Sequence, residues 1–261
     1  MRILVSNGSA GRLAASLSFT IAAALLAPPA HADRMVLWSI VHGQCVPHLE
    51  AGGPPAPCDS VDLSGGEARG VALLKDINGV AQMLAIPTRQ LAGIEDPALL
   101  APDAPAYFAA AWAGRARVEA HLGQALPREA VAVTVNSMVR RSQDELHLHV
   151  DCIDKDVAAA LGAYASSLDE QWRPMTVALK GRHYFARRLG SADLTEASPF
   201  RLLAEGIPGA KEEMGLWSLA AVGATFSGQP GFVLLADHAE ITAGGHAEDL
   251  QDHACQIAPK S

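Results

Sequence analysis

Two histidines, His147 and His149, stand one residue apart in a stretch where hydrophobic and polar residues alternate from Glu145 to Asp151. Alternation with a period of two predicts a β-strand, because successive side chains of a strand point to opposite faces. The two imidazoles therefore share one strand face with a carboxylate before them and a carboxylate after them. The opposite face carries hydrophobic side chains: Leu146, Leu148 and Val150.

Two imidazoles on one strand face allow three interpretations, and the spacing alone leaves all three open. The face can be solvated and do no chemistry. It can hold Zn²⁺ or Cu²⁺, with Glu145 or Asp151 as a further ligand. In the third interpretation one imidazole attacks phosphorus, and its neighbour orients it or binds the phosphoryl oxygens. Nearby donor side chains favour phosphorus chemistry. They are Asn136, Arg140, Arg141, Ser142 and Gln143.

The elements around this strand predict an α+β fold. Residues 70–87 are typical of two strands joined by a tight turn at residues 78–79. A long helix is expected from its N-cap, Asp103, to Gly123, which ends it. A β-branched strand at 131–135 then leads into the histidine strand. This order of hairpin, helix and hairpin predicts an antiparallel sheet covered by helices.

The rest of the chain again mixes strands and helices, but it shows no convincing sequence repeat. Helices are expected at 156–172 and from Ser198. Strands are expected at three places: 183–187, 214–222 and 232–235. We therefore predict two α+β halves, residues 33–153 and residues 154–261, with the second packed on the first.

The first 32 residues have the pattern of an export signal. Arg2 and Arg12 supply positive charge around the start of an uncharged apolar run at 13–27, and residues 30–32 form a small-x-small cleavage site. The apolar run is too short to span a bilayer comfortably. We predict a cleaved signal peptide and a periplasmic protein. An uncleaved anchor in the inner membrane is the alternative.

Export changes the interpretation of the four cysteines. An even number of cysteines in an oxidising compartment favours disulfides over metal thiolates, and four cysteines allow three connectivities. We favour Cys45–Cys58, which closes a short loop, and Cys152–Cys255, which ties down the C-terminus. Cys152 lies on the hydrophobic face of its strand, so it suits a buried disulfide better than a nucleophile.

The composition argues against nucleic acid as a partner. Acidic residues outnumber basic residues by 28 to 20, and the net charge is -8. Such a chain lacks the basic surface that binds nucleic acid or anionic lipid. Its 261 residues, 49% of them hydrophobic, can bury a core as one large domain or two small ones. The oligomeric state does not follow from these features.

The segments Asn136-Ser137, Ser142-Gln143 and Leu146–Val150 resemble the signature of the histidine-triad (HIT) superfamily of nucleotide hydrolases and transferases. The chain after the export signal resembles, more closely, the CDP-diacylglycerol pyrophosphatase family. The shared features include Cys45, Cys58 and five segments: residues 74–79, 135–137, 184–188, 198–200 and 251–255. The resemblance implies a HIT-like antiparallel sheet with covering helices, and a second half that is a divergent HIT-like unit.

This resemblance implies hydrolysis of CDP-diacylglycerol to CMP and phosphatidate. His147 is the expected nucleophile, which forms a covalent cytidylyl intermediate. His149 is expected to hold a phosphoryl oxygen or to fix the tautomer of His147. The residues expected to bind substrate are Asn136, Ser142, Gln143, Lys75 and Arg187. Glu145 occupies the position of the first triad histidine. Its side chain either orients a neighbouring ring or faces solvent, and of the two we expect it to face solvent.

The implied mechanism requires no cofactor, although a divalent cation can accompany the diphosphate. A lipid substrate implies contact with a membrane surface and an apolar groove, which we expect between the helices that carry Trp38 and Trp112. Two other functions stay open. One is a broader nucleoside-diphosphate pyrophosphatase. The other is a periplasmic protein that binds a metal or a nucleotide through His147 and His149.

Overall fold

A computed structural model of the chain describes residues 33–240 and 242–259. The signal peptide predicted for residues 1–32 lies outside this part of the chain. Residues Asp33–Ser261 form one compact unit. No helix in the described ranges is both long enough and apolar enough to cross a membrane.

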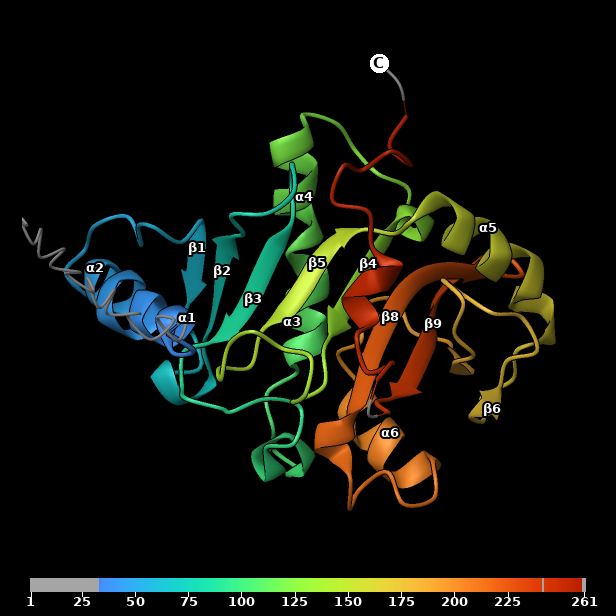
Figure 1. The fold of residues 1–261 in the computed structure, drawn as a ribbon. Coiled ribbons are helices and arrows are strands. Elements are labelled where there is room, and N and C mark those ends of the chain that lie inside the picture. The colour runs from blue at the N-terminus through green and yellow to red at the C-terminus, as the bar shows by residue number, and fades with distance from the viewer. Residues whose placement is uncertain (1–32, 241, 260–261) are drawn as a thin grey trace, which may run out of the picture. The chain divides into compact units, whose positions relative to one another are not determined.

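Nine strands of the described residues form one antiparallel sheet, in the order β1-β2-β3-β5-β4-β8-β9-β7-β6 (Figure 1). The strands are β1 (Ser60–Asp62), β2 (Val71–Lys75), β3 (Met83–Pro87), β4 (Val131–Val135), β5 (Leu148–Cys152), β6 (Arg173–Pro174), β7 (Phe185–Leu189), β8 (Trp217–Phe226) and β9 (Gln229–His238). The α+β class with an antiparallel sheet is confirmed.

The two halves predicted from sequence both contribute to this sheet. Strands β1 to β5 come from residues before 154, and strands β6 to β9 come from residues after it. The two sets join where β4 pairs with β8, with Val133 opposite Ala221. The two predicted halves therefore share one continuous sheet.

The helices are α1 (Val36–Ile40), α2 (Val46–Glu50), α3 (Tyr107–Ala113), α4 (Arg115–Leu122), α5 (Lys155–Tyr164) and α6 (Pro199–Gly206). A single π-helical turn, Val41–Cys45, joins α1 to α2. Asp154 caps α5 by accepting from the backbone nitrogen of Asp156, and Ser198 caps α6 by accepting from that of Arg201.

The extents predicted for two helices are wrong. The helix expected from Asp103 to Gly123 begins at Tyr107 and is divided at Gly114. A Cβ atom at Gly114 would lie 3.0 Å from Leu73 of β2, so the glycine lets the helix approach the sheet closely. Helix α5 ends at Tyr164 instead of residue 172. There the hydroxyl of Ser167 donates to the carbonyl of Tyr164 (2.6 Å), and the chain turns away.

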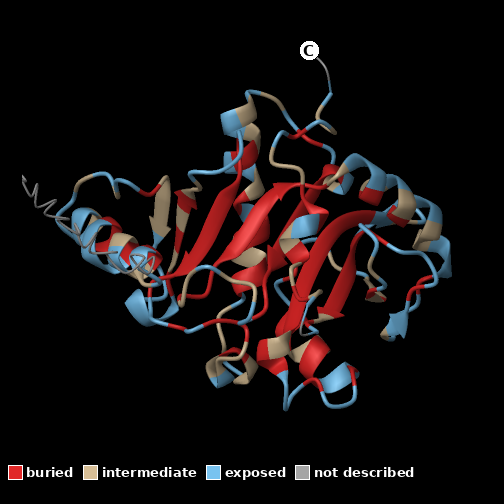
Figure 2. Ribbon diagram, viewed as in Figure 1, coloured by how far each residue is buried: buried red, intermediate tan, exposed pale blue. Residues whose placement is uncertain are grey.

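The two faces of the sheet are covered differently. Helices α3, α4 and α6 cover one face, over the largest hydrophobic cluster of the molecule (Figure 1). The other face carries two separate clusters, one under α1 and α2 and one under α5. Between these two clusters the strands present buried polar side chains, among them Thr134, His149 and Asp151. Figure 2 shows that the central strands are buried along most of their length.

Both predicted disulfides are formed. Cys45 is bonded to Cys58 with their Cα atoms 5.7 Å apart, and Cys152 is bonded to Cys255 with their Cα atoms 5.2 Å apart. The second bond ties the C-terminal segment to the end of β5. It therefore holds the 3₁₀ turn Ala247–Leu250 and the residues after it near the histidine strand.

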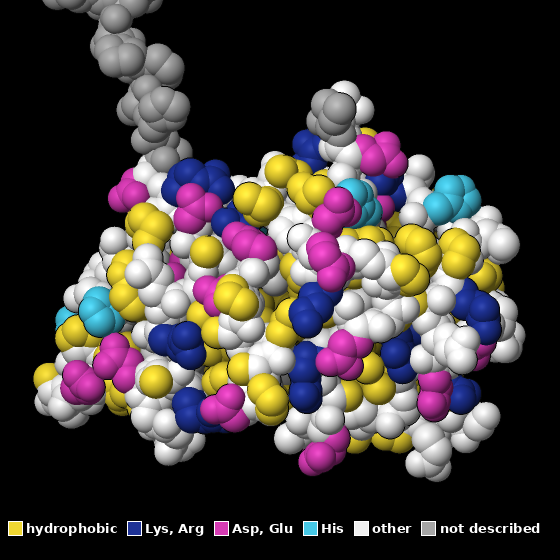
Figure 3. Space-filling view, turned by 90° about the horizontal axis from the view of Figure 1, so that it is seen from below, with side chains coloured by type: hydrophobic (Ala, Val, Ile, Leu, Met, Phe, Trp, Pro, Cys, Tyr) yellow, Lys and Arg dark blue, Asp and Glu magenta, His cyan; other side chains and the backbone are white. Residues whose placement is uncertain are grey.

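The molecular surface has the mixed charge expected from the composition. On the face shown in Figure 3, basic side chains are interspersed with acidic ones and with single hydrophobic side chains. No continuous basic patch gathers on that face.

Candidate active site

The two histidines lie together on the polar strip between the hydrophobic clusters. His149 belongs to β5, and His147 immediately precedes that strand. Their ring centroids are 4.9 Å apart, and the ring planes meet at 65°. The residues are only 6% and 5% exposed, respectively, so the interpretation as a solvated strand face is wrong.

His147 has the properties of a neutral nucleophile. Its Nδ1 atom lies 2.6 Å from the backbone oxygen of Glu145. Because a carbonyl oxygen can only accept, Nδ1 carries the proton and Nε2 keeps its lone pair. Burial, with a smaller contribution from His149, lowers the pKa of His147 to about 4. The imidazole is therefore uncharged at neutral pH.

The expectation that Glu145 faces solvent is wrong. The regular strand begins only at Leu148, so the alternation of side chains does not extend back to residue 145. The carboxyl group is fully buried, and its Oε1 atom accepts from the backbone nitrogen of Leu91 at 3.3 Å. Burial raises the pKa of Glu145 to about 8. Residue 145 contacts His147 through its main-chain carbonyl, so this contact does not depend on which side chain stands at position 145.

His149 is held by two residues from distant parts of the chain. The Nε2 atom of Gln82 lies 2.8 Å from Nδ1 of His149 and 2.9 Å from Oε1 of Glu248. When this amide donates one hydrogen to each, the proton of a neutral His149 lies on Nε2. The Nε2 atom is buried and has no partner among the described residues. It is thus a donor left free for a ligand.

Glu248 is the centre of this network. Its Oε1 atom lies 3.2 Å from Nδ1 of His149, and its Oε2 atom accepts from Nδ2 of Asn136 at 3.0 Å. Burial alone would raise the pKa of Glu248, but the His149 ring and the donors on Gln82 and Asn136 outweigh burial and hold that pKa well below its usual range. The carboxylate therefore stays charged and holds the amides of Gln82 and Asn136 in place.

A second histidine–carboxylate pair, His253 and Asp151, lies next to Glu248. The Nδ1 atom of His253 is 2.8 Å from the buried carboxylate of Asp151, and its Nε2 atom is 3.5 Å from Oε1 of Glu248. The hydrogen bond to Asp151 raises the pKa of His253. Asp151, expected beside the histidines as a possible metal ligand, is therefore engaged by the C-terminal segment.

The histidines open into a cleft of about 260 Å³ between α1, the β2–β3 hairpin and the C-terminal segment. Ser142 lines the cleft and is exposed. Gln143 also lines it, but its amide accepts from the backbone nitrogen of Leu37 (3.3 Å) and donates to the carbonyl of Asp33 (3.1 Å). Ser142 is thus free for a ligand, whereas Gln143 holds the start of α1.

Lys75 is the cation that lines this cleft. Its Nζ atom donates to the carbonyl oxygens of Asp76 (2.6 Å), Asn78 (3.3 Å) and Gly79 (3.0 Å). The lysine thus closes the hairpin turn and places a positive charge at the cleft. The structure therefore brings together Lys75, Asn136, Ser142, Gln143 and the two histidines.

Arg187 does not join this group. It lies on β7, and its guanidinium stacks 5.9 Å from the ring of Trp172. Phe185 and Leu189, two residues away on either side, pack against the cluster under α3 and α6. Arg187 shares their face, which is the face opposite the histidines.

The apolar groove expected between the helices of Trp38 and Trp112 does not exist. Trp112 is 2% exposed and packs edge-on against Phe232, on the α3 face of the sheet. Trp38 belongs to α1 on the other face and stacks on His42, with ring centroids 4.4 Å apart. The two helices cover opposite faces, which sequence periodicity cannot reveal.

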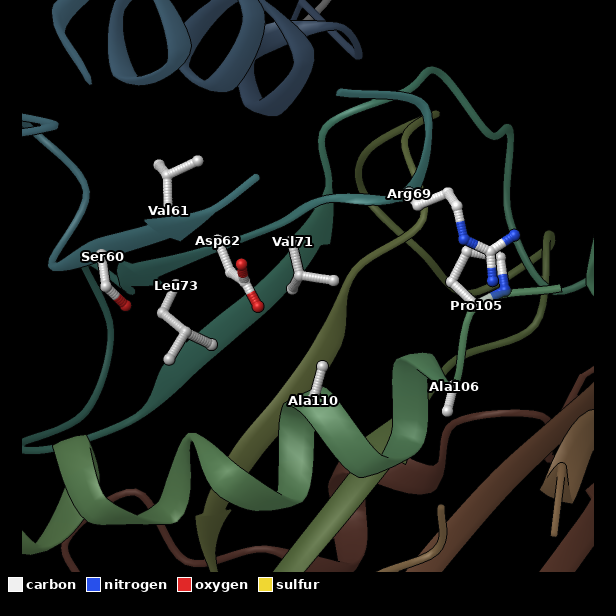
Figure 4. Close-up of a pocket in the computed structure, with 9 residues that line it drawn as sticks. All are labelled: Ser60, Val61, Asp62, Arg69, Val71, Leu73, Pro105, Ala106 and Ala110. Atoms are coloured by element: carbon white, nitrogen blue, oxygen red, sulfur yellow. The ribbon is translucent and has the colours of Figure 1, made fainter. Parts of the chain in front are cut away.

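A second hollow of about 210 Å³ lies between β1, β2 and α3 (Figure 4). Its charged side chains are Asp62 and Arg69, and Arg69 donates to the carbonyl of Asp103 at 2.7 Å. Val71 and Leu73 in its wall belong to the α3 face. The hollow therefore faces away from the histidines and takes no part in their site.

Sequence reasoning missed Gln82, Glu248 and His253. Gln82 carried a weak signal, because it is a polar residue at the start of a hydrophobic strand. His253 lies in a segment shared with the family, but its spacing from the other histidines gives no sign of a role in the site. Nothing in the sequence marks Glu248, since its partners are 112 and 166 positions away along the chain.

Potential metal ligands gather at one place in the described residues. Asp151, Cys152 and Cys255 have ligand atoms within 4.8 Å of one another, and the two sulfurs form a disulfide. In this part of the chain, no third histidine, cysteine or carboxylate joins His147 and His149 within that distance.

Known proteins resemble this chain over nearly its whole length. A family model for CDP-diacylglycerol pyrophosphatase matches residues 32–259. The chain belongs to the CDP-diacylglycerol pyrophosphatase family. A CDP-diacylglycerol pyrophosphatase of Yersinia pestis is 39% identical over 241 residues, which cover 92% of this chain and 91% of that protein. Membership of this pyrophosphatase family confirms the predicted family and the predicted hydrolase class.

Proposed function

We propose that this protein hydrolyses CDP-diacylglycerol to CMP and phosphatidate through a covalent cytidylyl intermediate on His147. Family membership supports the substrate. The observation that carries the mechanism is the 2.6 Å hydrogen bond from Nδ1 of His147 to the carbonyl of Glu145. It leaves the Nε2 lone pair of a neutral imidazole available at a cleft large enough for a diphosphate.

In the first step, Nε2 of His147 attacks the cytidine-side phosphorus. The N–P bond forms while the bond from phosphorus to the bridging oxygen breaks, and phosphatidate leaves with that electron pair. In the second step, water attacks the same phosphorus and releases one proton to the solvent. The N–P bond breaks, the imidazole takes back its electron pair, and CMP is released.

The other cleft residues bind charge that develops on the phosphates. The Nε2–H group of His149 donates to a phosphoryl oxygen, and Glu248 holds the Gln82 amide that fixes this tautomer of His149. Lys75 attracts the diphosphate, and Ser142 donates its hydroxyl. Asn136 acts through Glu248, and Gln143 acts by holding α1.

No cofactor is required in this proposal, since the nucleophile, the donor and the cation all come from the chain. Turnover should accordingly persist when the enzyme and substrate are treated with a chelator. We also propose a periplasmic location, supported by the two disulfides and by the pattern of residues 1–32.

Rapid-quench mass spectrometry tests the intermediate. The protein should gain the mass of one cytidylyl group during turnover, and His147→Ala should abolish both this adduct and the release of CMP. His183→Ala is the matched control, because His183 contacts the carbonyl of Met175 away from the cleft, and it should retain both. Turnover without an adduct would point to direct attack by water.

Assays of the same purified protein distinguish the proposed function from the two other functions. Faster hydrolysis of CDP-choline than of CDP-diacylglycerol would favour a broader nucleoside-diphosphate pyrophosphatase. A stoichiometric metal with no hydrolysis of either compound would favour a binding protein that uses His147 and His149 as ligands.

A further inference from the structure

Large hydrophobic side chains are exposed at the mouth of the catalytic cleft. Ile77 is 97% exposed, Val80 is 56% exposed and Val36 is 41% exposed. Val36 and Ile77 line the same cleft as His147, from opposite sides. Val80 follows in the same hairpin, and its backbone nitrogen donates to the carbonyl of His253 (2.9 Å). We call these three residues the apolar rim.

The fold does not need the side chains of the hairpin tip to be apolar. Asn78 makes the turn by donating its backbone nitrogen to Asp76 (2.9 Å), and Gly79 adopts the left-handed conformation (φ +68°). Ile77 and Val80 belong to none of the hydrophobic clusters found among the described residues. Turn tips of a water-soluble surface are usually polar, so two apolar side chains here indicate a contact with something apolar.

Val36, on the other side of the rim, lies close in sequence to residues 1–32. Residues 1–32, with their uncharged apolar run, end immediately before Asp33, and Val36 begins α1 three residues later. A segment of this type is delivered to a bilayer during export, whether or not it is later cleaved. An export segment in residues 1–32 would therefore join the chain close to this edge of the cleft.

We propose that the apolar rim docks on the surface of a lipid bilayer, so that the diacylglycerol chains stay in or near the membrane while the diphosphate reaches His147. This inference rests on the proposed function for its substrate. The apolar rim is expected to contact the apolar interior of the bilayer and not its anionic headgroups. The chain carries a net charge of -8, and such a composition does not favour binding to anionic headgroups. Docking is therefore expected to be insensitive to salt.

The test compares two double variants of the full chain on two forms of substrate. Ile77→Ser with Val80→Ser removes the exposed apolar groups of the hairpin. Val139→Ser with Val177→Ser is the matched control, since these valines are 53% and 39% exposed and do not line the cleft. The substrates are CDP-diacylglycerol in phosphatidylcholine vesicles and a water-soluble CDP-diacylglycerol with short acyl chains.

The rim variant should lose activity on vesicles by about tenfold or more, since each buried aliphatic side chain contributes about that factor to partitioning. Its activity on the short-chain substrate, which needs no bilayer, should fall far less, so that the ratio of vesicle activity to short-chain activity drops by about tenfold or more. The control should behave like the unmodified protein on both substrates. Raising the salt concentration should leave the ratio of the two activities unchanged.

Several outcomes would overturn this proposal. Equal losses on both substrates would assign Ile77 and Val80 to catalysis or folding, and no loss on vesicles would remove any role in docking. A rim variant that changes the oligomeric state but keeps its vesicle activity would show that a second copy covers the rim. If the unmodified protein hydrolyses neither substrate, the proposed function fails; rim-dependent sedimentation with vesicles would then still support docking.

Discussion

At the scale of single residues, the site depends on main-chain and side-chain contacts that fix each imidazole differently. The carbonyl of Glu145 holds Nδ1 of His147 and leaves the lone pair of its Nε2 atom free, as the proposed nucleophile needs. Gln82, which also donates to Glu248, donates to Nδ1 of His149 and leaves the Nε2 atom of that ring as a donor. Two identical side chains thus take two roles because their neighbours differ.

The pH dependence of the reaction should reflect the low pKa of His147. Burial lowers that pKa from 6.5 to about 4, so the neutral nucleophile persists as the pH falls and is lost only near pH 4. We expect kcat/KM on the short-chain substrate to show no loss from protonation of His147 between about pH 7 and pH 5, and to fall about tenfold per pH unit below about pH 4. An acid limb near pH 6.5 would contradict this assignment, provided that circular dichroism shows a folded protein throughout.

Glu145 should make the protein less stable at alkaline pH. Its pKa is raised from 4.5 to about 8, so the unfolded chain releases the proton above about pH 4.5 while the folded protein keeps it until about pH 8. The protonated Glu145 carboxyl group therefore stabilises the folded protein fully below about pH 4.5, and this stabilisation is lost as the pH rises to about 8. Glu145→Gln should raise the free energy of unfolding at pH 8 by on the order of 3 kcal/mol, and should change it little at pH 4.

Thermal denaturation at the two pH values measures this effect. The exposed Glu196→Gln is a matched control, and it should shift Tm little at either pH. A Glu145→Gln variant with the same change in Tm at pH 4 and pH 8 would show that the effect does not come from a buried, titrating carboxyl group.

At the scale of elements, the histidine strand supplies only half of the site. The other half comes from the C-terminal segment, which crosses the polar strip and brings Glu248 and His253 to the strand. The disulfide from Cys152 to Cys255 ties this segment to β5, with 103 positions between the two cysteines. The bond therefore has both a structural and a positioning role.

Replacing both Cys152 and Cys255 with serine should lower the free energy of unfolding by about 4 kcal/mol, because the unfolded chain gains the freedom of a long loop. Turnover should fall as well, since Glu248 loses its fixed place beside His149.

Glu248→Gln with the disulfide intact separates the two effects. It should reduce kcat about ten- to a hundredfold, through the loss of a charge-assisted contact, with a small change in stability. Full activity in Glu248→Gln would remove this residue from the mechanism.

At the scale of the whole molecule, one sheet joins the segments on either side of residue 153. The largest hydrophobic cluster contains Met83 and Leu148 from the first segment and Phe200 and Phe232 from the second. A cluster shared in this way is expected to be lost as a whole when either segment is removed.

Residues 33–153 and 154–261 should therefore not fold when produced separately. Each segment would expose a central strand, β4 or β8, along the edge where the two normally pair. We expect a single cooperative unfolding transition for the intact chain and little stable structure by circular dichroism for either segment. A folded segment 33–153 with a cooperative transition would instead support two independent domains.

Local sequence patterns were sufficient to predict many features of this protein. Alternation of side chains predicted that His147 and His149 lie together and that Cys152 lies on the opposite face of β5, and local signals predicted helices near the starts of α5 and α6. Export and loop length led to both disulfides. These features depend on neighbours along the chain or on simple chemistry, so one sequence is enough to predict them.

The tertiary structure decided everything that depends on residues distant in sequence. It buried Glu145, because the strand starts after that residue and Leu91 approaches it. It put Arg187 on the opposite face of the sheet, and it brought Gln82 and Glu248 to His149. Resemblance of the sequence to a known family was enough to single out His147 as the proposed nucleophile. Only the packing of the sheet and the C-terminal segment determined its tautomer, its neutral charge and its partners, since these depend on burial and on contacts made across the fold.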